Sequence, residues 1–404
     1  MTAFINAVRN TTLSFDKWIL FSIVMLLAAG LVMNLMATSN RLSDNGSMDS
    51  PSYMKYKVDI YAKFRAHLIK VVFGLVFAVL CYIMPVDWWR KMKLPMILIG
   101  ISLVLFVLVR MFGENVNGAK RWLRVGGFQL SPSDVARFAL VLWLADFLAK
   151  KKEELHHPIN LFKAGVVVAM IAIPIILQPN LSTVMIIAAI AGAMLWVAGI
   201  PRKWVYSAII CLGIFGAVYV AGTSFRHTRS QVFLDPFAAY QKYAASASID
   251  PNAPTALKET SYQQRQSIIA LVEGGVTGVG FGTGRQKYFL PEAYNDCIVA
   301  IIGEEWGLVG ILIVMLLYTV LTWRGFRVTM NAPDQFRYLL AFGIIINFLT
   351  YFFIHFFVNV SAMPSTGVPL PFISHGGTAM VFNLGLAAIL LRISSEAKCP
   401  LYPK

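Results

Sequence analysis

Long apolar runs dominate the chain, and each is close to the roughly 20 residues that cross a bilayer as a helix. The first run, from Trp18 to Met36, contains no charged residue, whereas the fourth is interrupted by Asp134, Arg137 and Asp146. The pattern predicts an all-α polytopic membrane protein with ten transmembrane helices, near residues 17–38, 66–84, 94–112, 134–149, 163–178, 181–199, 203–222, 296–322, 336–360 and 376–392.

The longest stretch between apolar runs covers residues 223–295, between the predicted seventh and eighth helices. It is rich in Ser, Ala, Gly and Pro, which is typical of a loop. We find no appended soluble segment at either end. The sequence therefore predicts a single membrane domain over residues 1–404, with a large extracytoplasmic loop between helices seven and eight.

Composition supports the membrane class. Of 404 residues, 57% are hydrophobic and 14% are charged, whereas soluble proteins carry about 25% charged residues. These values exclude a soluble enzyme, a disordered chain and a secreted disulfide scaffold. The four cysteines are interpreted as small apolar residues rather than as a disulfide framework; they are Cys81, Cys211, Cys297 and Cys399.

The net charge of +15 would suggest a nucleic-acid partner in a soluble protein. With the N-terminus inside, however, the cytoplasmic segments carry more Lys and Arg than the short outer loops, as the positive-inside rule requires. We therefore expect both termini in the cytoplasm. The outer side keeps further basic residues that insertion does not require, and these indicate an anionic partner, with no role for nucleic acid.

Two outer segments combine charges near predicted helix ends. Lys120 and Arg121 precede Trp122 after the third helix, which suits either an interfacial belt or a phosphate headgroup. Asp134 and Arg137 lie three residues apart at the start of the fourth helix. They share a helix face and are expected to pair, and capping is a more common role for Asp134 than catalysis.

A glycine-rich segment, residues 273–287, ends the long loop. Six glycines in eleven positions allow tight turns, and Arg285 and Lys287 follow them. The segment lacks the Gly-Lys-Ser/Thr of a Walker loop. Glycine content alone is a weak indication of a phosphate cradle, and the two cations strengthen it.

Three acidic residues begin the eighth predicted helix. Asp296 lies at its outer end, where an N-cap is the ordinary role and a general base acting on a phosphate-bearing lipid is the alternative. Glu304 and Glu305 lie two turns further in, where insertion scales put the cost of an Asp carboxylate at roughly 2.5–3.5 kcal/mol. These two glutamates must therefore face a polar cavity or a basic partner.

The segment between the last two helices, residues 359–378, has no formal charge and many Pro, Gly and hydroxyl side chains. Irregular backbone at membrane depth is tolerated when it is buried in protein or lines a cavity, so we interpret it as a re-entrant cavity wall. A single histidine such as His375 is more often structural than catalytic. These features fit a transporter of an anionic substrate as well as an enzyme acting on a lipid phosphate.

Five segments resemble the signature segments of the SEDS family, which contains the FtsW and RodA peptidoglycan polymerases. They occur in the family's order and are NGAKRWL (117–123), SPSDVAR (131–137), QPNLST (178–183), GVGFGTGRQKYFLPEAYNDCIVAIIGEEWGLVG (278–310) and PSTGVPLPFISHGGT (364–378). The triplet at 285–287 and the segment at 302–305 resemble the division branch, FtsW, more than the elongation branch, RodA.

The resemblance implies polymerisation of lipid II into glycan strands at the outer face of the membrane. The family's essential aspartate falls on Asp296, which would accept the proton of the acceptor 4-hydroxyl while undecaprenyl pyrophosphate leaves. Candidate residues for binding the pyrophosphate or the rest of lipid II are Arg285, Lys287, Lys120, Arg121, Arg226, Arg229, Glu304, Glu305, Ser374 and His375.

The resemblance does not establish a cofactor. A divalent cation, Mg²⁺ or Mn²⁺, could share in neutralising the charge of the pyrophosphate. The resemblance implies a class B penicillin-binding protein transpeptidase (FtsI-like) as partner, because this chain has no crosslinking domain. It also implies other membrane proteins of the division machinery as partners. The expected location is the bacterial cytoplasmic membrane, at the division septum.

Four positions depart from the family pattern. Asn180 replaces an Asp, Asp134 and Arg137 replace Glu and Lys, and His375 replaces a Tyr, while Asp296 is unchanged. A lipid II flippase, a RodA-type elongation polymerase and a division scaffold without chemistry remain as alternatives.

Overall fold

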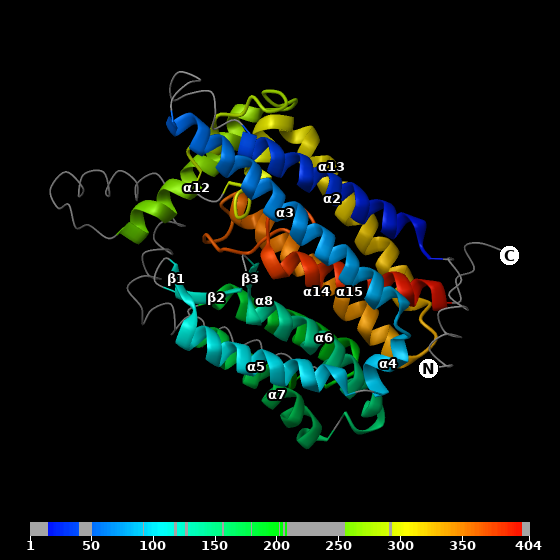
Figure 1. The fold of residues 1–404 in the computed structure, drawn as a ribbon. Coiled ribbons are helices and arrows are strands. Elements are labelled where there is room, and N and C mark those ends of the chain that lie inside the picture. The colour runs from blue at the N-terminus through cyan, green and yellow to red at the C-terminus, as the bar shows by residue number, and fades with distance from the viewer. Residues whose placement is uncertain are drawn as a thin grey trace.

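The structure is a computed structural model that describes residues 15–39, 51–91, 93–116, 119–125, 128–155, 157–178, 180–201, 203–204, 207, 255–290 and 293–397. The fold is a bundle of long helices (Figure 1). The longer helices are α2 (Lys17–Ser39), α3 (Pro51–Ile83), α5 (Leu94–Phe112), α6 (Pro132–Lys150), α7 (Pro158–Leu177), α8 (Leu181–Val197), α12 (Thr255–Gly274), α13 (Ile298–Met330), α14 (Gln335–Asn359) and α15 (Gly377–Glu396).

Each predicted span that the structure describes is helical, whereas α12 is a further helix inside the predicted loop at 223–295. Seven helices are long and apolar enough to cross a membrane, and α8 is a shorter apolar helix. Helix α6 also follows its predicted range, although its charges lower its hydropathy. The predicted seventh span, residues 203–222, lies almost wholly outside the described residues. The polytopic helical class is therefore confirmed, while the number ten stays a prediction.

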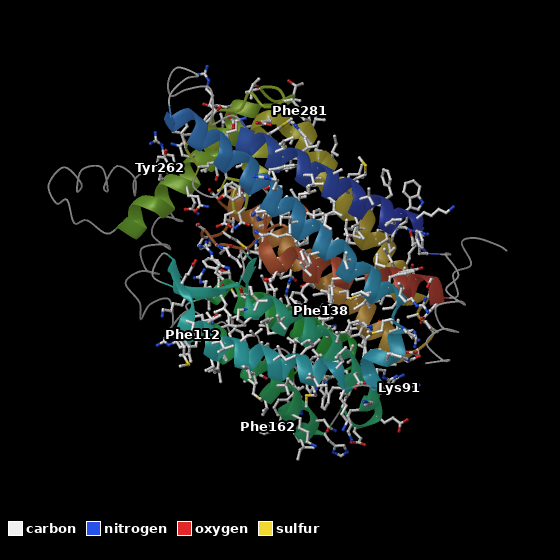
Figure 2. All side chains as sticks on the ribbon, viewed as in Figure 1. Lys91, Phe112, Phe138, Phe162, Tyr262 and Phe281 are labelled. Carbon is white, nitrogen blue, oxygen red and sulfur yellow. The ribbon has the colours of Figure 1, made fainter. Side chains whose placement is uncertain are left out.

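Helices α6, α14 and α15 form the centre of the bundle, and α3, α5 and α7 lie toward its outside. Figure 2 shows Phe138 of α6 in the middle, where it is 1% exposed, and Phe162 of α7 at the edge, where it is 71% exposed. Large apolar side chains such as Phe73 and Val104 also face outward. This arrangement suits a lipid environment, in which outward apolar surface needs no cover.

A small antiparallel sheet follows α5, and the sequence pattern did not predict it. Its strands are β1 (Glu114–Val116), β2 (Ala119–Val125) and β3 (Phe128–Leu130), in the order β1-β2-β3. Lys120 and Arg121 thus lie on a strand rather than at the end of a membrane helix. The sheet and α12 lie at one end of the bundle (Figure 1).

Helix α13 is broken at Gly307, which has φ 66° and ψ −162°. A Cβ at this position would lie 2.4 Å from the Gly278 nitrogen and the Val276 oxygen, so only glycine fits. The glycine-rich segment enters the break, where Leu308 donates to the Gly275 carbonyl and Val309 to the Val276 carbonyl. The predicted single apolar span is therefore two helical pieces held around a loop.

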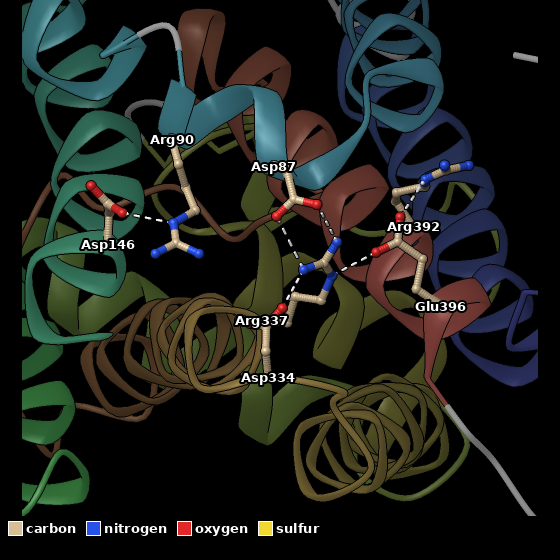
Figure 3. A network of polar contacts seen from close by, with 7 residues as sticks. All are labelled: Asp87, Arg90, Asp146, Asp334, Arg337, Arg392 and Glu396. Atoms are coloured by element: carbon tan, nitrogen blue, oxygen red, sulfur yellow. Dashed lines mark hydrogen bonds and ion pairs between the residues drawn. The ribbon is translucent and has the colours of Figure 1, made fainter. Parts of the chain in front are cut away.

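Charged side chains gather at the opposite end of the bundle (Figure 3). Arg337 of α14 pairs with Asp334, with Glu396 and with Asp87 of the short helix α4 (Val86–Lys91). Arg90 of α4 pairs with Asp146 of α6 at 2.8 Å. The arginines of this network are among the basic residues assigned to the cytoplasmic side from the sequence. Their separation from the sheet end agrees with that assignment.

Candidate active site

Asp296 lies directly before α13, at the sheet end of the bundle, and is half-buried. The helix N-cap is Cys297, which forms no side-chain capping hydrogen bond. The interpretation of Asp296 as an N-cap is therefore wrong. The general-base interpretation of Asp296 stays a prediction.

Asn359, at the end of α14, holds the backbone around Asp296. Its Nδ2 donates to the Asp296 carbonyl at 3.0 Å, and its Oδ1 accepts from the Ala300 nitrogen at 3.1 Å. The segment that follows also approaches the carboxylate, because a Cβ built on Gly367 would lie 3.4 Å from Asp296 Oδ2. The uncharged segment at 359–378 thus lies beside Asp296, while its interpretation as a re-entrant cavity wall stays a prediction.

Ser374 and His375 bind the residues immediately before Asp296. Ser374 Oγ donates to the Asn295 carbonyl at 2.8 Å and accepts from the Leu370 nitrogen at 2.9 Å. The His375 nitrogen donates to the Tyr294 carbonyl at 3.1 Å. Both predicted substrate-binding candidates therefore lie at the Asp296 loop, and each position has a positioning role there.

Glu304 and Glu305 anchor the glycine-rich segment. Glu305 Oε1 lies 2.9 Å from Lys287 Nζ, and both side chains are buried. Glu304 Oε1 accepts from the Arg285 and Gln286 nitrogens. The predicted basic partner of the two glutamates is thus found for Glu305, while backbone N–H groups serve Glu304.

These contacts change the interpretation of the glycine-rich segment. Its Val279 and Gly280 nitrogens donate to the Glu304 and Glu305 carbonyls, and the Gly282 nitrogen donates to the Glu305 carboxylate. These backbone N–H groups already donate to carbonyl and carboxylate oxygens of the protein. They are therefore not available as a phosphate cradle. Lys287 is 2% exposed and is neutralised by Glu305, so in this arrangement it holds the segment and does not face a substrate.

Arg285, Lys120 and Arg121 are the predicted cations that keep an accessible side chain within the described residues. Arg285 is exposed, and it forms no ion pair within the described part of the chain. Lys120 is half-buried on β2, and the neighbouring Arg121 donates from Nε to the Gln178 carbonyl at 3.4 Å. The predicted Arg226 and Arg229 lie outside the described residues.

The expected Asp134–Arg137 pair is confirmed at the centre of the bundle. Arg137 Nη2 lies 3.4 Å from Asp134 Oδ1, and Thr378 Oγ1 donates to Asp134 Oδ2 at 2.7 Å. Arg137 also donates to Asn347 and Asn383. The pair joins α6, α14 and α15, so its role is structural.

Asn180 has a local structural role. Its side chain accepts from the Thr183 nitrogen at 3.4 Å and caps α8. An amide oxygen caps as well as a carboxylate does, so the family's Asp is not needed for this function.

The sequence interpretation missed two residues near this site, Lys70 and His67 of α3. Lys70 Nζ lies 3.0 Å from His375 Nε2. A signal was available, because Lys70 stands within an apolar run and an ionisable residue inside a membrane span is a functional candidate by default.

The metal prediction gains no support from side-chain geometry. Within the described ranges, no group of three or more His, Cys, Asp and Glu side chains is placed to hold a metal ion. Mg²⁺ is often held by one or two carboxylates together with substrate phosphates, so a divalent cation stays a prediction.

Fold and site together define a polytopic membrane protein with a carboxylate loop at one end of its bundle. Residues 16–399 match the family model for cell cycle proteins named after FtsW, RodA and SpoVE. The chain belongs to this family, and the resemblance found in the sequence is confirmed.

Similar proteins cover almost the whole chain. It is 30% identical over 386 residues to the probable peptidoglycan glycosyltransferase FtsW of Methylomonas methanica, covering 94% of this chain and 92% of that protein. It is 31% identical over 393 residues to the protein of the same name from Burkholderia thailandensis, covering 96% and 80%.

Two solved structures share the fold. A structure described as "Structural coordination of polymerization and crosslinking by a peptidoglycan synthase complex" matches with a TM-score of 0.70 at 22% identity, covering 95% of this chain and 99% of that chain. The Thermus thermophilus rod shape determining protein RodA matches with a TM-score of 0.64 at 19% identity, covering 96% and 99%.

Proposed function

We propose that this protein is a peptidoglycan glycosyltransferase of the FtsW type, which polymerises lipid II at the outer face of the cytoplasmic membrane with Asp296 as general base. The observation that carries the proposal is the Asp296 loop. Asn359, Ser374 and His375 hold the backbone at and just before Asp296, and the segment at Gly367 approaches its carboxylate. The family and the names of the relatives support the class of reaction.

In the proposed reaction, Asp296 accepts the proton of the acceptor sugar's 4-hydroxyl. The hydroxyl oxygen forms a bond to the anomeric carbon of the donor sugar, and the bond from that carbon to the pyrophosphate oxygen breaks. Undecaprenyl pyrophosphate leaves with the electron pair. A positioned general base contributes about 10²–10⁴-fold to such a step, and fixed backbone contacts keep it in place.

The leaving pyrophosphate needs positive charge, because negative charge builds on its oxygens in the transition state. Arg285, Lys120 and Arg121 are the accessible candidates among the cations predicted from the sequence. Arg226 and Arg229 remain candidates, and Mg²⁺ or Mn²⁺ could share this task.

The setting of the reaction is also part of the proposal. The relatives' FtsW names support a role in septal synthesis, with a RodA-type role in elongation as the alternative. The structural match to a peptidoglycan synthase complex supports pairing with a class B penicillin-binding protein transpeptidase. The charge network opposite the Asp296 end supports cytoplasmic termini.

A polymerisation assay tests the proposal. The purified full chain, with its transpeptidase partner, is given labelled lipid II, and glycan strands are separated on a gel. We expect Asp296→Ala to lower the rate by about 10²-fold or more and the exposed Glu153→Gln control to leave it unchanged. A folded Asp296→Ala protein that polymerises at the normal rate would contradict the proposal.

The flippase alternative is tested with wild-type protein and an Asp296→Asn variant. Lipid II translocation is followed in liposomes that contain wild-type protein or Asp296→Asn. Wild-type translocation of lipid II without any glycan product would favour the flippase.

A further inference from the structure

Lys70 is a buried cation at the Asp296 end of the molecule. It lies on α3, is 6% exposed, and its Nζ is 3.0 Å from His375 Nε2. His375 belongs to the loop that binds Asp296, because its backbone nitrogen donates to the Tyr294 carbonyl and its ring packs edge-on against the Tyr294 ring at 5.6 Å. Lys70 is therefore coupled through a single side chain to the backbone two residues before Asp296.

His67 adds a third basic side chain to this cluster. It lies three residues before Lys70, on the same face of α3. Its ring centroid is 4.7 Å from that of His375, and it is 1% exposed. Neither of its ring nitrogens has a hydrogen-bond partner among the described residues. A buried polar group without a partner is costly. Here both ring nitrogens of His67 lack one, beside the buried ammonium group of Lys70.

Comparison with the other buried cations sets Lys70 apart. Within the described residues, every other Lys or Arg that is buried forms an ion pair with a carboxylate, whereas Lys70 contacts the uncharged nitrogen of an imidazole. The paired cations are Arg137, Lys287, Arg324, Arg337 and Arg392. Because a buried charge is costly unless it is paired, the Lys70 site has the charge of an anion-binding site whose anion is not part of the chain.

The geometry leaves donors for such an anion. An ammonium group has three N–H bonds, and His375 accepts one of them. His375 and Tyr294 are half-buried, whereas Lys70 and His67 are buried. Helix α15 begins at Gly377, and its N-terminal amides add positive potential next to His375.

We propose that Lys70, His67 and His375 form a phosphate-binding site that holds the pyrophosphate of a lipid-linked substrate beside Asp296. This inference rests on the proposed function for the identity of the substrate. Lys70 is the central cation, His375 orients it and His67 supplies a further nitrogen. Lys70 is a cation inside the bundle, in addition to Arg285 and Lys120. The low dielectric constant there strengthens the attraction of Lys70 for an anion.

Binding of farnesyl pyrophosphate to the full chain in phosphatidylcholine nanodiscs, measured by calorimetry, tests the site. We expect Lys70→Met to weaken binding by about tenfold or more, as for the loss of a charged hydrogen bond. Lys70→Arg should restore most of the affinity. The matched control is Lys163→Met, which removes an exposed lysine from α7 near the opposite end and should leave binding unchanged. Wild-type affinity in a folded Lys70→Met protein would overturn the inference.

A second variant covers the case in which Lys70→Met does not fold. His67→Phe keeps an aromatic ring against His375 but removes both ring nitrogens. We expect it to weaken binding of farnesyl pyrophosphate by about threefold to tenfold, with thermal unfolding near that of wild type. An unchanged affinity in His67→Phe, together with loss of folding in Lys70→Met, would assign the cluster a structural role and overturn the inference.

Two further arms identify the source of the phosphate. Inorganic pyrophosphate and nanodiscs containing phosphatidylglycerol are tested as competitors of farnesyl pyrophosphate. Weak competition by both supports a lipid-linked pyrophosphate. Equal binding of inorganic pyrophosphate, or displacement by phosphatidylglycerol, overturns that assignment.

The same titration in Asp296→Ala separates this inference from the proposed function. Lys70-dependent binding that persists in Asp296→Ala supports the phosphate site, whatever the polymerisation assay shows. A wild-type protein that polymerises lipid II but whose binding of farnesyl pyrophosphate does not depend on Lys70 overturns the phosphate site and leaves the proposed function intact.

Discussion

The side chain of Asn359 donates a hydrogen bond to the backbone carbonyl of Asp296 at 3.0 Å, although 62 residues separate them in the chain. The same side chain accepts from the Ala300 nitrogen in the first turn of α13. One amide therefore fixes both the candidate base and the helix that follows it. A contact of this kind positions a catalytic group without touching the substrate.

Asn359→Ala should lower polymerisation without removing it. The change breaks these two hydrogen bonds and a third, from Nδ2 to the His355 carbonyl. It leaves the Ala300 nitrogen without this partner, at a cost of about 1–3 kcal/mol in stability. We expect kcat to fall and KM for lipid II to change little. The control is Asn331→Ala, because Asn331 donates to the Arg327 carbonyl at the opposite end of α13. Equal losses of kcat in both variants would contradict a positioning role.

The buried pair of Lys287 and Glu305 should be a major source of stability for the glycine-rich segment. Lys287→Met leaves the Glu305 carboxylate buried without its cation, which typically costs about 3–5 kcal/mol. Adding Glu305→Gln to Lys287→Met should recover part of this loss. Thermal unfolding in detergent of the two single variants and the double variant gives the coupling free energy. A coupling near zero would show that the pair is not needed.

Long apolar runs were enough to predict the described spans. A membrane helix satisfies its own backbone hydrogen bonds, so it can be recognised from its local sequence. The i,i+3 spacing likewise predicted the Asp134–Arg137 pair. The break at Gly307 was beyond this reasoning, since it depends on the close approach of Gly278 from another segment.

The site itself was predicted only in part. Asp296 was found through family resemblance, not through its spacing. The contact of Lys70 with His375 joins residues 305 positions apart. No local sequence pattern could predict a contact between residues so far apart in the chain. Lys70 itself, a single lysine within an apolar run, could be recognised. The burial of Lys287 could not be seen in the sequence, because its partner Glu305 comes from the next helix.

Gly307→Ala should strongly destabilise the protein. The residue has φ 66°, and a Cβ would lie 2.4 Å from two backbone atoms of the glycine-rich segment. The matched control is Gly100→Ala in α5, where a Cβ would meet nothing within 4 Å. That control should be neutral or stabilising by about 0.5–1 kcal/mol, because alanine favours a helix interior. Melting temperatures that change equally in the two variants would contradict the close approach at Gly307.

Arg337 should be the most sensitive residue of the network at the opposite end (Figure 3). Its guanidinium pairs with Asp334, with Asp87 at 3.0 Å and with Glu396 at 2.6 Å, and it joins α4, α14 and α15. Arg337→Leu leaves three carboxylates close together, so they repel one another and lose their shared donor. We expect a loss of about 1–3 kcal/mol, less than for a fully buried pair, because Asp87 and Asp334 are partly exposed to water.

A surface pair provides the control for this loss. Lys151 and Glu154 lie 2.8 Å apart, but both are substantially exposed. Lys151→Ala should change the melting temperature very little, because water and salt screen an exposed pair. Arg337→Lys should restore only part of the stability, since an ammonium cannot present the planar fork that reaches several carboxylates at once. Full rescue by lysine would mean that charge alone, and not the geometry of the fork, holds α4, α14 and α15 together.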